Sequence, residues 1–181
     1  MVYVFLANGF EEVEALAPVD LMRRVDIPVT TVGVGGKVIE GSHGIKVVVD
    51  ITDAEFVYDD GVEMVVLPGG MPGTLELEKA ICVNNAVDAA ERDGKYIAAI
   101  CAAPSILGHK GLLRGKKACC YPGFEEQLIQ ANTTTDRVTI DGNIITARAA
   151  GTAYEFAHKL IEVLRDKETA DGVLASILCK K

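Results

Sequence analysis

The chain has 181 residues, of which 49% are hydrophobic and 24% are charged, a composition typical of a folded globular protein. Its formal net charge of −8 argues against a nucleic acid or an anionic membrane surface as partner, because either would favour a basic face. No apolar run approaches the roughly 20 residues that a membrane-spanning helix requires. The length suits a single domain over residues 1–181.

Strand-like and helix-like segments alternate along the chain, which predicts an α/β fold with a mainly parallel sheet. In chain order we expect a strand over 2–7, a helix over 11–25 interrupted by Pro18, a strand over 28–34, a hairpin over 35–50, a strand over 63–68, a helix over about 78–92, a strand over 96–100, a helix from near Ala102, a strand over 116–120, a hairpin over 137–147, a helix over 151–167 and a short helix over 168–181. Ligands of such sheets bind beyond the carboxyl ends of the strands.

The five cysteines give no sign of a disulfide framework or a zinc site. Their number is odd, and no Cys-x-x-Cys pair occurs. The apolar segment at 2–7 lacks a preceding basic region and turns acidic directly afterwards, unlike a signal peptide. We therefore expect reduced thiols and a cytoplasmic location.

Cys101 lies where a predicted strand turns into a predicted helix, with Ala99 and Ala102 as small neighbours and Pro104 in the first helical turn. This layout matches the nucleophile elbow of Gly-x-Ser-x-Gly hydrolases, with cysteine as the nucleophile and alanine in place of glycine. A helix N-terminus stabilises a thiolate, so we expect the pKa of the Cys101 thiol to lie below its usual value of about 8.5. The alternative is a packed core cysteine, and this stretch alone does not decide between the two.

Glu14 is the carboxylate of the helix over 11–25 that is expected to point inward. It shares a face with apolar residues such as Leu21, and burial should raise its pKa and keep it protonated. A protonated carboxyl could donate a hydrogen bond to a thiolate or relay a proton. Glu11 and Glu12 are expected to be exposed first-turn residues that complement the helix dipole.

Two glycines, Gly69 and Gly70, follow the predicted strand over 63–68. They either let backbone N–H groups approach a ligand, as an oxyanion hole requires, or simply form a tight turn. No dinucleotide or P-loop motif occurs, and the three scattered histidines lack the spacing of metal ligands. We therefore expect neither a cofactor nor a metal.

With these residues in view, the chain resembles the ThiJ/PfpI superfamily, in the branch of the Parkinson's-associated protein DJ-one and its bacterial relatives. The resemblance covers nearly the whole chain and is specific through the order and spacing of four segments. These are "FLANGFEEVEALAPVDLMRR" (5–24), "EMVVLPGGMPGT" (63–74), "IAAICAAPSIL" (97–107) and "ITARAAGTAYEFA" (145–157).

The resemblance implies a flavodoxin-like three-layer α/β sandwich and a homodimer. It implies that Cys101 is the reactive elbow cysteine and that Glu14 is the protonated glutamate that hydrogen-bonds it. Gly70 and Ala102 match the backbone N–H donors beside the thiol.

Three positions differ from residues found in parts of the family. Tyr121 stands where many relatives have a histidine, so turnover is expected to be modest if that histidine moves a proton. His43 stands, in a loose alignment, where some relatives place an arginine of the partner subunit near the site. Ala102 follows the cysteine where the protease branch has histidine, which makes peptidase activity unlikely in this chain.

The resemblance implies a cofactor-independent glyoxalase or deglycase acting on small methylglyoxal-like dicarbonyls. The alternative is an oxidative-stress sensor or chaperone in which Cys101 is oxidised to a sulfinic acid without turnover. Both readings need Cys101 and Glu14, so the sequence does not separate them.

Overall fold

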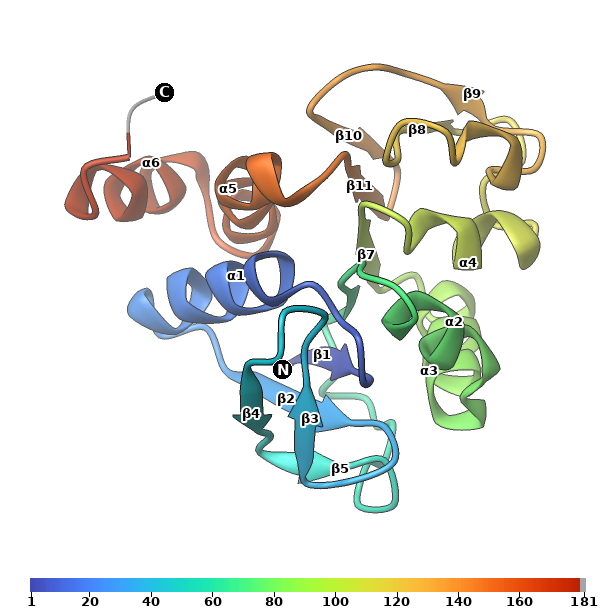
Figure 1. The fold of residues 1–181 in the computed structure, drawn as a ribbon. Helices are drawn as coiled ribbons and strands as arrows, with labels where there is room; N and C mark the ends of the chain where they lie inside the picture. The colour runs from blue at the N-terminus through green and yellow to red at the C-terminus, as the bar shows by residue number, and fades with distance from the viewer. Residues whose placement is uncertain (180–181) are drawn as a thin grey trace.

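The computed structural model describes residues 1–179, and a seven-stranded sheet forms its centre (Figure 1). The strands of this sheet are β1 (Val2–Leu6), β2 (Val29–Gly33), β5 (Ile51–Thr52), β6 (Met64–Leu67), β7 (Tyr96–Ile100), β10 (Val138–Asp141) and β11 (Ile144–Ala147). The helices are α1 (Glu12–Arg24), α2 (Gly73–Lys79), α3 (Ile81–Arg92), α4 (Pro104–His109), α5 (Ala153–Leu164) and α6 (Lys167–Ser176), with short 3-10 turns η1 (Glu125–Gln127) and η2 (Ala150–Thr152). Two separate two-stranded sheets lie outside this central sheet. One pairs β3 (Val38–Glu40) with β4 (Lys46–Val48), and the other pairs β8 (Lys117–Ala118) with β9 (Asn132–Thr133).

The order of the strands places the expected ligand site at the carboxyl ends of the central strands. The order is β10-β11-β7-β6-β1-β2-β5, and every neighbouring pair is parallel except β10 with β11. The chain runs outward from β1 to β2 and then returns to β6 on the other side of β1, which makes the β1–β6 boundary a topological switch point. The mainly parallel α/β sheet expected from the sequence is therefore confirmed.

Helices cover both faces of the sheet. The side chains of Val4 and Leu6 enter a core shared with α1, α5 and α6, whereas Phe5 enters the core beneath α2, α3 and α4. Successive residues of a strand point to opposite faces, so one buried strand supplies both cores. Figure 1 shows α1, α5 and α6 together on one side and α2, α3 and α4 on the other. This is the predicted three-layer, flavodoxin-like sandwich.

The helix expected over about 78–92 is α3, which begins at Ile81, and the helix before it, α2, was not expected. They are separated at Ala80, whose backbone is extended with φ −70° and ψ 121°. The Asn84 side-chain amide donates to the carbonyl oxygens of Glu78 at 2.7 Å and Ala80 at 3.0 Å. The bond to Glu78 satisfies a carbonyl group that the end of α2 leaves without a helical partner, whereas the Ala80 carbonyl also accepts the Asn84 N–H at 3.0 Å in the first turn of α3.

The strand expected over 116–120 is shorter and lies outside the main sheet. Only Lys117–Ala118 is a strand, and it pairs with β9. The N–H of Cys119 donates instead to the Thr146 hydroxyl at 3.0 Å, which diverts the backbone from ladder pairing.

Two further expectations for α1 and the C-terminus need correction. The helix α1 continues through Pro18, and Met22 on it is fully buried in the core. The final helix ends at Ser176, and the last part of its predicted span, 180–181, lies outside the described residues.

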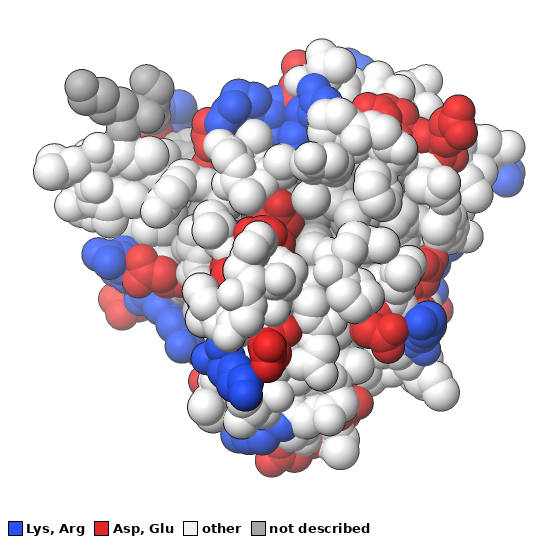
Figure 2. Space-filling view, in the orientation of Figure 1, with Lys and Arg blue, Asp and Glu red and all other residues white. Residues whose placement is uncertain are grey.

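On the face seen in Figure 2, basic side chains gather near the top and along the lower left, with acidic side chains among them. Among residues 1–179, no helix has the length and apolar character needed to cross a membrane.

Candidate active site

Cys101 occupies a strained turn between β7 and α4. Its φ is +65°, in the left-handed region that residues other than glycine rarely adopt. The turn is held on both sides, because the Cys101 N–H donates to the Ala147 carbonyl at 2.9 Å and the Cys101 carbonyl accepts from the Tyr121 N–H at 2.8 Å. These bonds hold Cys101 at the carboxyl end of β7, in the elbow conformation that the sequence predicts.

Gly69 leaves the space in which the thiol and a carboxyl group meet. A Cβ atom at Gly69 would lie 2.6 Å from the Cys101 Cβ and 2.6 Å from Oε2 of Glu14. Contacts this short are essentially never seen, so no larger residue fits without displacing one of the two groups. The next residue, Gly70, has φ +93°, and its Cβ would lie 2.3 Å from the Glu11 nitrogen. Close packing therefore requires glycine at both positions, in addition to any need of the tight turn.

Glu14 is buried, with 1% of its surface exposed, and faces this space from the first turn of α1. Its Oε2 accepts the Gly69 N–H at 3.0 Å, and its carboxyl also hydrogen-bonds the Cys101 side chain and the Ala150 N–H. Burial raises the pKa of Glu14 to about 7, aided by the charge of Glu11, while these three hydrogen bonds oppose the increase. The inward placement expected of Glu14 is thus what the structure has.

The Cys101 thiol has a raised pKa, not the lowered one expected from the sequence. Burial is the largest cause, followed by the charge of Glu14 and the hydrogen bond to it, and together they raise the thiol pKa to about 12. The N–H groups of Ala102 and Gly70 hydrogen-bond the sulfur and lower the pKa, but they do not outweigh burial. The expected lower pKa was wrong because it considered only the stabilisation of the thiolate by the helix N-terminus. It did not include burial, which destabilises the charged sulfur and raises the pKa.

Glu14 and Cys101 hydrogen-bond each other and therefore hold their protons as a pair. When one proton is lost, the negative charge can sit on the carboxylate or on the sulfur. With the remaining proton on the carboxyl, its O–H donates to the sulfur, and the repulsion by Glu14 that raises the thiol pKa is absent. The pair can thus present a thiolate although an isolated thiol at this position would stay protonated.

Glu12 is buried rather than exposed, which corrects the sequence expectation. A loop over 41–45 covers it: Glu12 accepts from the His43 N–H at 2.9 Å, from the Ile45 N–H at 3.5 Å and from the Ser42 hydroxyl at 3.3 Å, and its Oε2 lies 3.0 Å from Nδ1 of His43. Burial raises the pKa of Glu12, but these hydrogen bonds outweigh it and bring the pKa to about 2. The sequence could not show that a distant loop folds over this carboxylate.

His43 and Tyr121, which were expected to line the site, lie at different places around it. His43 is exposed and pairs with Glu12 and Glu11 of its own chain, and the hydrogen bond to Glu12 is the main cause that raises its pKa. Tyr121 contacts Cys101 through its backbone, while its half-exposed ring meets Phe124 edge-on at a centroid distance of 6.5 Å.

Two backbone groups of the site were missed by the sequence analysis. The Ala147 carbonyl accepts from the Cys101 N–H, and the Ala150 N–H donates to Glu14. Both belong to the segment over 145–157, one of the four that carry the family resemblance. Every residue has a backbone carbonyl and nearly every residue has an N–H group, so the residue type does not reveal which of these groups takes part in a site.

Glu11, Glu12 and His43 are the described residues that could hold a metal ion. One donor atom from each lies within 4.8 Å of the others. The Glu12 carboxylate already accepts several hydrogen bonds from the loop over 41–45. Histidine and carboxylate oxygens suit several divalent metals, so the donor set alone selects none.

The chain matches known proteins over most of its length. The model of the DJ-1/PfpI family matches residues 1–163. The chain is 41% identical over 183 residues to "Protein DJ-1 homolog A" of Arabidopsis thaliana. This match covers 99% of the chain but only 46% of the relative, so the chain spans about half of the relative's length. It is 32% identical over 168 residues to a deglycase of Pyrococcus abyssi, covering 91% of this chain and 99% of that protein. The structure titled "Toxoplasma gondii DJ-1, oxidized" has a TM-score of 0.94 and 34% identity, covering 99% of this chain and 98% of that one.

Proposed function

The chain belongs to the DJ-1/PfpI family, and on this basis we propose that it is a cofactor-independent glyoxalase or deglycase that acts on small methylglyoxal-like dicarbonyls. The observation that carries the proposal is the pairing of Cys101, held at φ +65°, with the buried Glu14 carboxyl. The pair combines a nucleophile with a group that can give and take a proton near neutral pH. The Pyrococcus relative named a deglycase supports the same class of reaction.

In the proposed reaction the Cys101 sulfur adds to the aldehyde carbon of the dicarbonyl. The C–S bond forms as the C=O π bond breaks, and the resulting oxyanion takes a proton to give a hemithioacetal. The N–H groups of Gly70 and Ala102, which hydrogen-bond the sulfur at rest, stabilise that oxyanion.

Glu14 then moves a proton between two carbon atoms. Its carboxylate removes the hydrogen on the carbon bonded to sulfur, which gives an enediol, and its carboxyl returns a proton to the neighbouring carbon. The product is a thioester of a hydroxy acid. Water hydrolyses it to lactate, when the substrate is methylglyoxal, and to the free thiol. Electrons stay within the substrate, so no oxidant or reductant is needed.

Methylglyoxal consumption without glutathione, metal or nucleotide tests this proposal. We expect turnover by the wild-type protein and none by Cys101→Ser, because a serine hydroxyl here lacks an adjacent histidine to activate it. Tyr121→His should increase turnover by up to about 10²-fold, the contribution of a positioned general base. A rate equal to that of Cys101→Ser would overturn the enzyme proposal; a rate unchanged by Tyr121→His would overturn only the role given to that position.

A redox sensor is the second candidate function. The relative from Toxoplasma gondii is described as oxidized, and in this chain Glu14 is placed to hydrogen-bond an oxygen added to Cys101. If this is the function, peroxide adds two oxygen atoms to Cys101 selectively, and Glu14→Leu removes the selectivity. Mass spectrometry of peptides after limited peroxide treatment measures both.

A further inference from the structure

The segment between β11 and α5 contacts both partners of the thiol site through its backbone. The Ala147 carbonyl accepts from the Cys101 N–H at 2.9 Å, and the Ala150 N–H donates to the Glu14 carboxyl. The conformation of residues 147–150 therefore influences how the sulfur and the carboxyl lie relative to each other. A side chain that fixes this conformation acts on the site without touching the sulfur or the carboxyl.

The buried side chain of Thr152 closes the turn η2 onto Ala149. Its Oγ1 donates to the Ala149 carbonyl at 2.7 Å and accepts from the Ala149 N–H at 3.2 Å. The Thr152 N–H donates to the same carbonyl at 2.7 Å. A threonine that precedes a helix ordinarily accepts from an N–H group in the first turn of that helix, but the Thr152 side chain makes no such bond to α5. The hydroxyl of Thr152 therefore acts on the turn that faces Glu14 and not on the helix that follows.

The bonds from Thr152 set the direction of the Ala150 N–H group. The Ala149 carbonyl and the Ala150 N–H belong to one planar trans peptide group, in which C=O and N–H point in opposite directions. Because Thr152 holds the carbonyl on one side, the N–H points to the other side, where it donates to Glu14. Rotation of this peptide group would remove the donor from Glu14.

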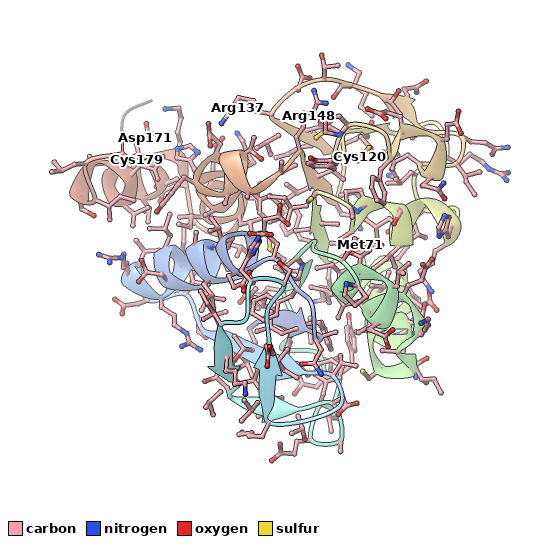
Figure 3. The ribbon with its side chains drawn as sticks, viewed as in Figure 1. Met71, Cys120, Arg137, Arg148, Asp171 and Cys179 are labelled. Carbon is pink, nitrogen blue, oxygen red and sulfur yellow. The ribbon has the colours of Figure 1, made fainter. Side chains whose placement is uncertain are left out.

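A guanidinium group extends this row of hydrogen bonds to the surface. Nη2 of Arg137, which Figure 3 labels, donates to the Gly151 carbonyl at 2.6 Å. That carbonyl shares a peptide group with the Thr152 N–H, so Arg137 also helps to orient the donor to Ala149. Hydrogen bonds in a row polarise one another, and the positive charge of Arg137 therefore strengthens the donors further along the row.

We propose that Thr152 is a positioning residue of the thiol site: it orients the Ala149–Ala150 peptide group so that the N–H reaches the Glu14 carboxyl, and Arg137 supports it from the surface. Without this donor, Glu14 loses a hydrogen bond that favours its charged form. The catalytic consequence rests on the proposed function, in which the Glu14 carboxylate removes a proton from the substrate. A Glu14 that stays protonated to higher pH does so less readily at pH 7.

Titration of the Glu14 carboxyl by NMR, in protein labelled with ¹³C at the glutamate carboxyl groups, tests the proposal. The Glu14 signal is identified by its absence in Glu14→Gln. Thr152→Val keeps the shape of the side chain but removes the hydroxyl, so the Glu14 midpoint should rise from about 7 by up to about one pH unit, the effect of one hydrogen bond to a charged group. Thr152→Ser keeps the hydroxyl and should restore the wild-type midpoint. Arg137→Ala should raise the midpoint by a smaller amount.

Two control variants separate positioning from a general loss of stability. Thr139→Val removes another buried threonine hydroxyl, one that bonds a neighbouring threonine, and should leave the Glu14 midpoint unchanged whatever its effect on the melting temperature. Glu155→Gln removes the ion pair that Arg137 makes at 2.7 Å but leaves the bond from Arg137 to Gly151, and it should not raise the midpoint.

An unchanged Glu14 midpoint in Thr152→Val, with the variant folded by circular dichroism, would overturn the proposal, and so would a raised midpoint that Thr152→Ser does not restore. If Thr152→Val fails to fold, Arg137→Ala decides: a raised midpoint supports the proposal and an unchanged one overturns it. The titration needs no turnover. Absence of methylglyoxal conversion by the wild type would therefore overturn the proposed function and leave the positioning role of Thr152 in place.

Discussion

The shared proton of Glu14 and Cys101 is the central feature of this protein at the residue scale. A buried carboxyl with a pKa of about 7 changes its charge within the physiological range, and a buried thiol with a pKa of about 12 does not do so by itself. We therefore propose that the reactivity of Cys101 near neutral pH depends on Glu14.

The rate at which iodoacetamide alkylates Cys101 should rise as the pH passes through about 7. Below that pH both groups are protonated; above it the pair has lost one proton and can place its charge on sulfur. Glu14→Leu should abolish this step and slow alkylation at pH 7, because the thiol must then ionise alone in a buried position. Peptide mapping at several pH values measures the rate for Cys101 separately from the other thiols.

The buried thiols provide an internal comparison for that experiment. Cys119 and Cys120 are both buried, although a regular strand would turn one of them outward, and burial raises the pKa of Cys120 to about 12 against the opposing charge of Arg148. Figure 3 shows Cys120 and Arg148 on the same side of the molecule. Labelling of Cys119 or Cys120 ahead of Cys101 would contradict the account.

Gly69→Ala should slow alkylation of Cys101 by about tenfold or more, because the added methyl group displaces the thiol or the Glu14 carboxyl. Gly172→Ala is the matched control, since nothing lies within 4 Å of its added Cβ and it should leave the rate unchanged. If circular dichroism shows both variants to be folded and Gly69→Ala is alkylated as fast as the wild type, the site accepts a methyl group at Gly69 and the steric argument is wrong.

At the scale of elements, the loop over 41–45 is fastened to α1 by one buried carboxylate. Glu12→Leu removes both acceptor oxygens, so the hydrogen bonds that the His43 and Ile45 N–H groups donate to Oε1 are lost. The amide hydrogens of His43 and Ile45 should exchange about tenfold faster, as expected for the loss of one hydrogen bond to a charged group. Glu40→Leu, an exposed change on the same hairpin, is the control, and equal exchange in the two variants would contradict this role of Glu12.

The same carboxylate sets the sensitivity of the loop to acid. The pKa of Glu12 is lowered from 4.5 to about 2, so the folded state favours the charged form. Its stabilisation is fully present above 4.5 and is lost as the pH falls toward 2. The loop is therefore expected to stay fastened throughout the range in which Glu14 titrates.

Elements with strong periodic patterns were predictable, and those defined by distant partners were not. The strands around Val4, Val66 and Ala98 were found because buried parallel strands are short apolar runs. The break in the helix at Ala80 was not predicted, because alanine favours the helical conformation and the tertiary fold overrides that preference here. Likewise the positions of Cys101 and Glu14 followed from local pattern, whereas the raised thiol pKa depends on burial that no local pattern records.

At the scale of the whole molecule, we expect the homodimer that the family resemblance implies. Light scattering at micromolar concentration should give twice the chain mass of 19.3 kDa. The helix α1 offers little apolar surface for such a contact, because Met22 is buried and Val13, at 46% exposed, is its most exposed large hydrophobic residue. A mass of 19.3 kDa under these conditions would contradict the expectation.

The most direct test of the proposed chemistry is conversion of methylglyoxal in D₂O, with detection of lactate by proton NMR. If Glu14 removes a hydrogen from one carbon and returns an exchangeable proton to the next, lactate from the wild type carries deuterium at C2, and Cys101→Ser forms none above background. Lactate formed by Glu14→Leu at the wild-type rate would contradict the role of Glu14 as proton carrier. Lactate at the same level in Cys101→Ser would contradict the account as a whole.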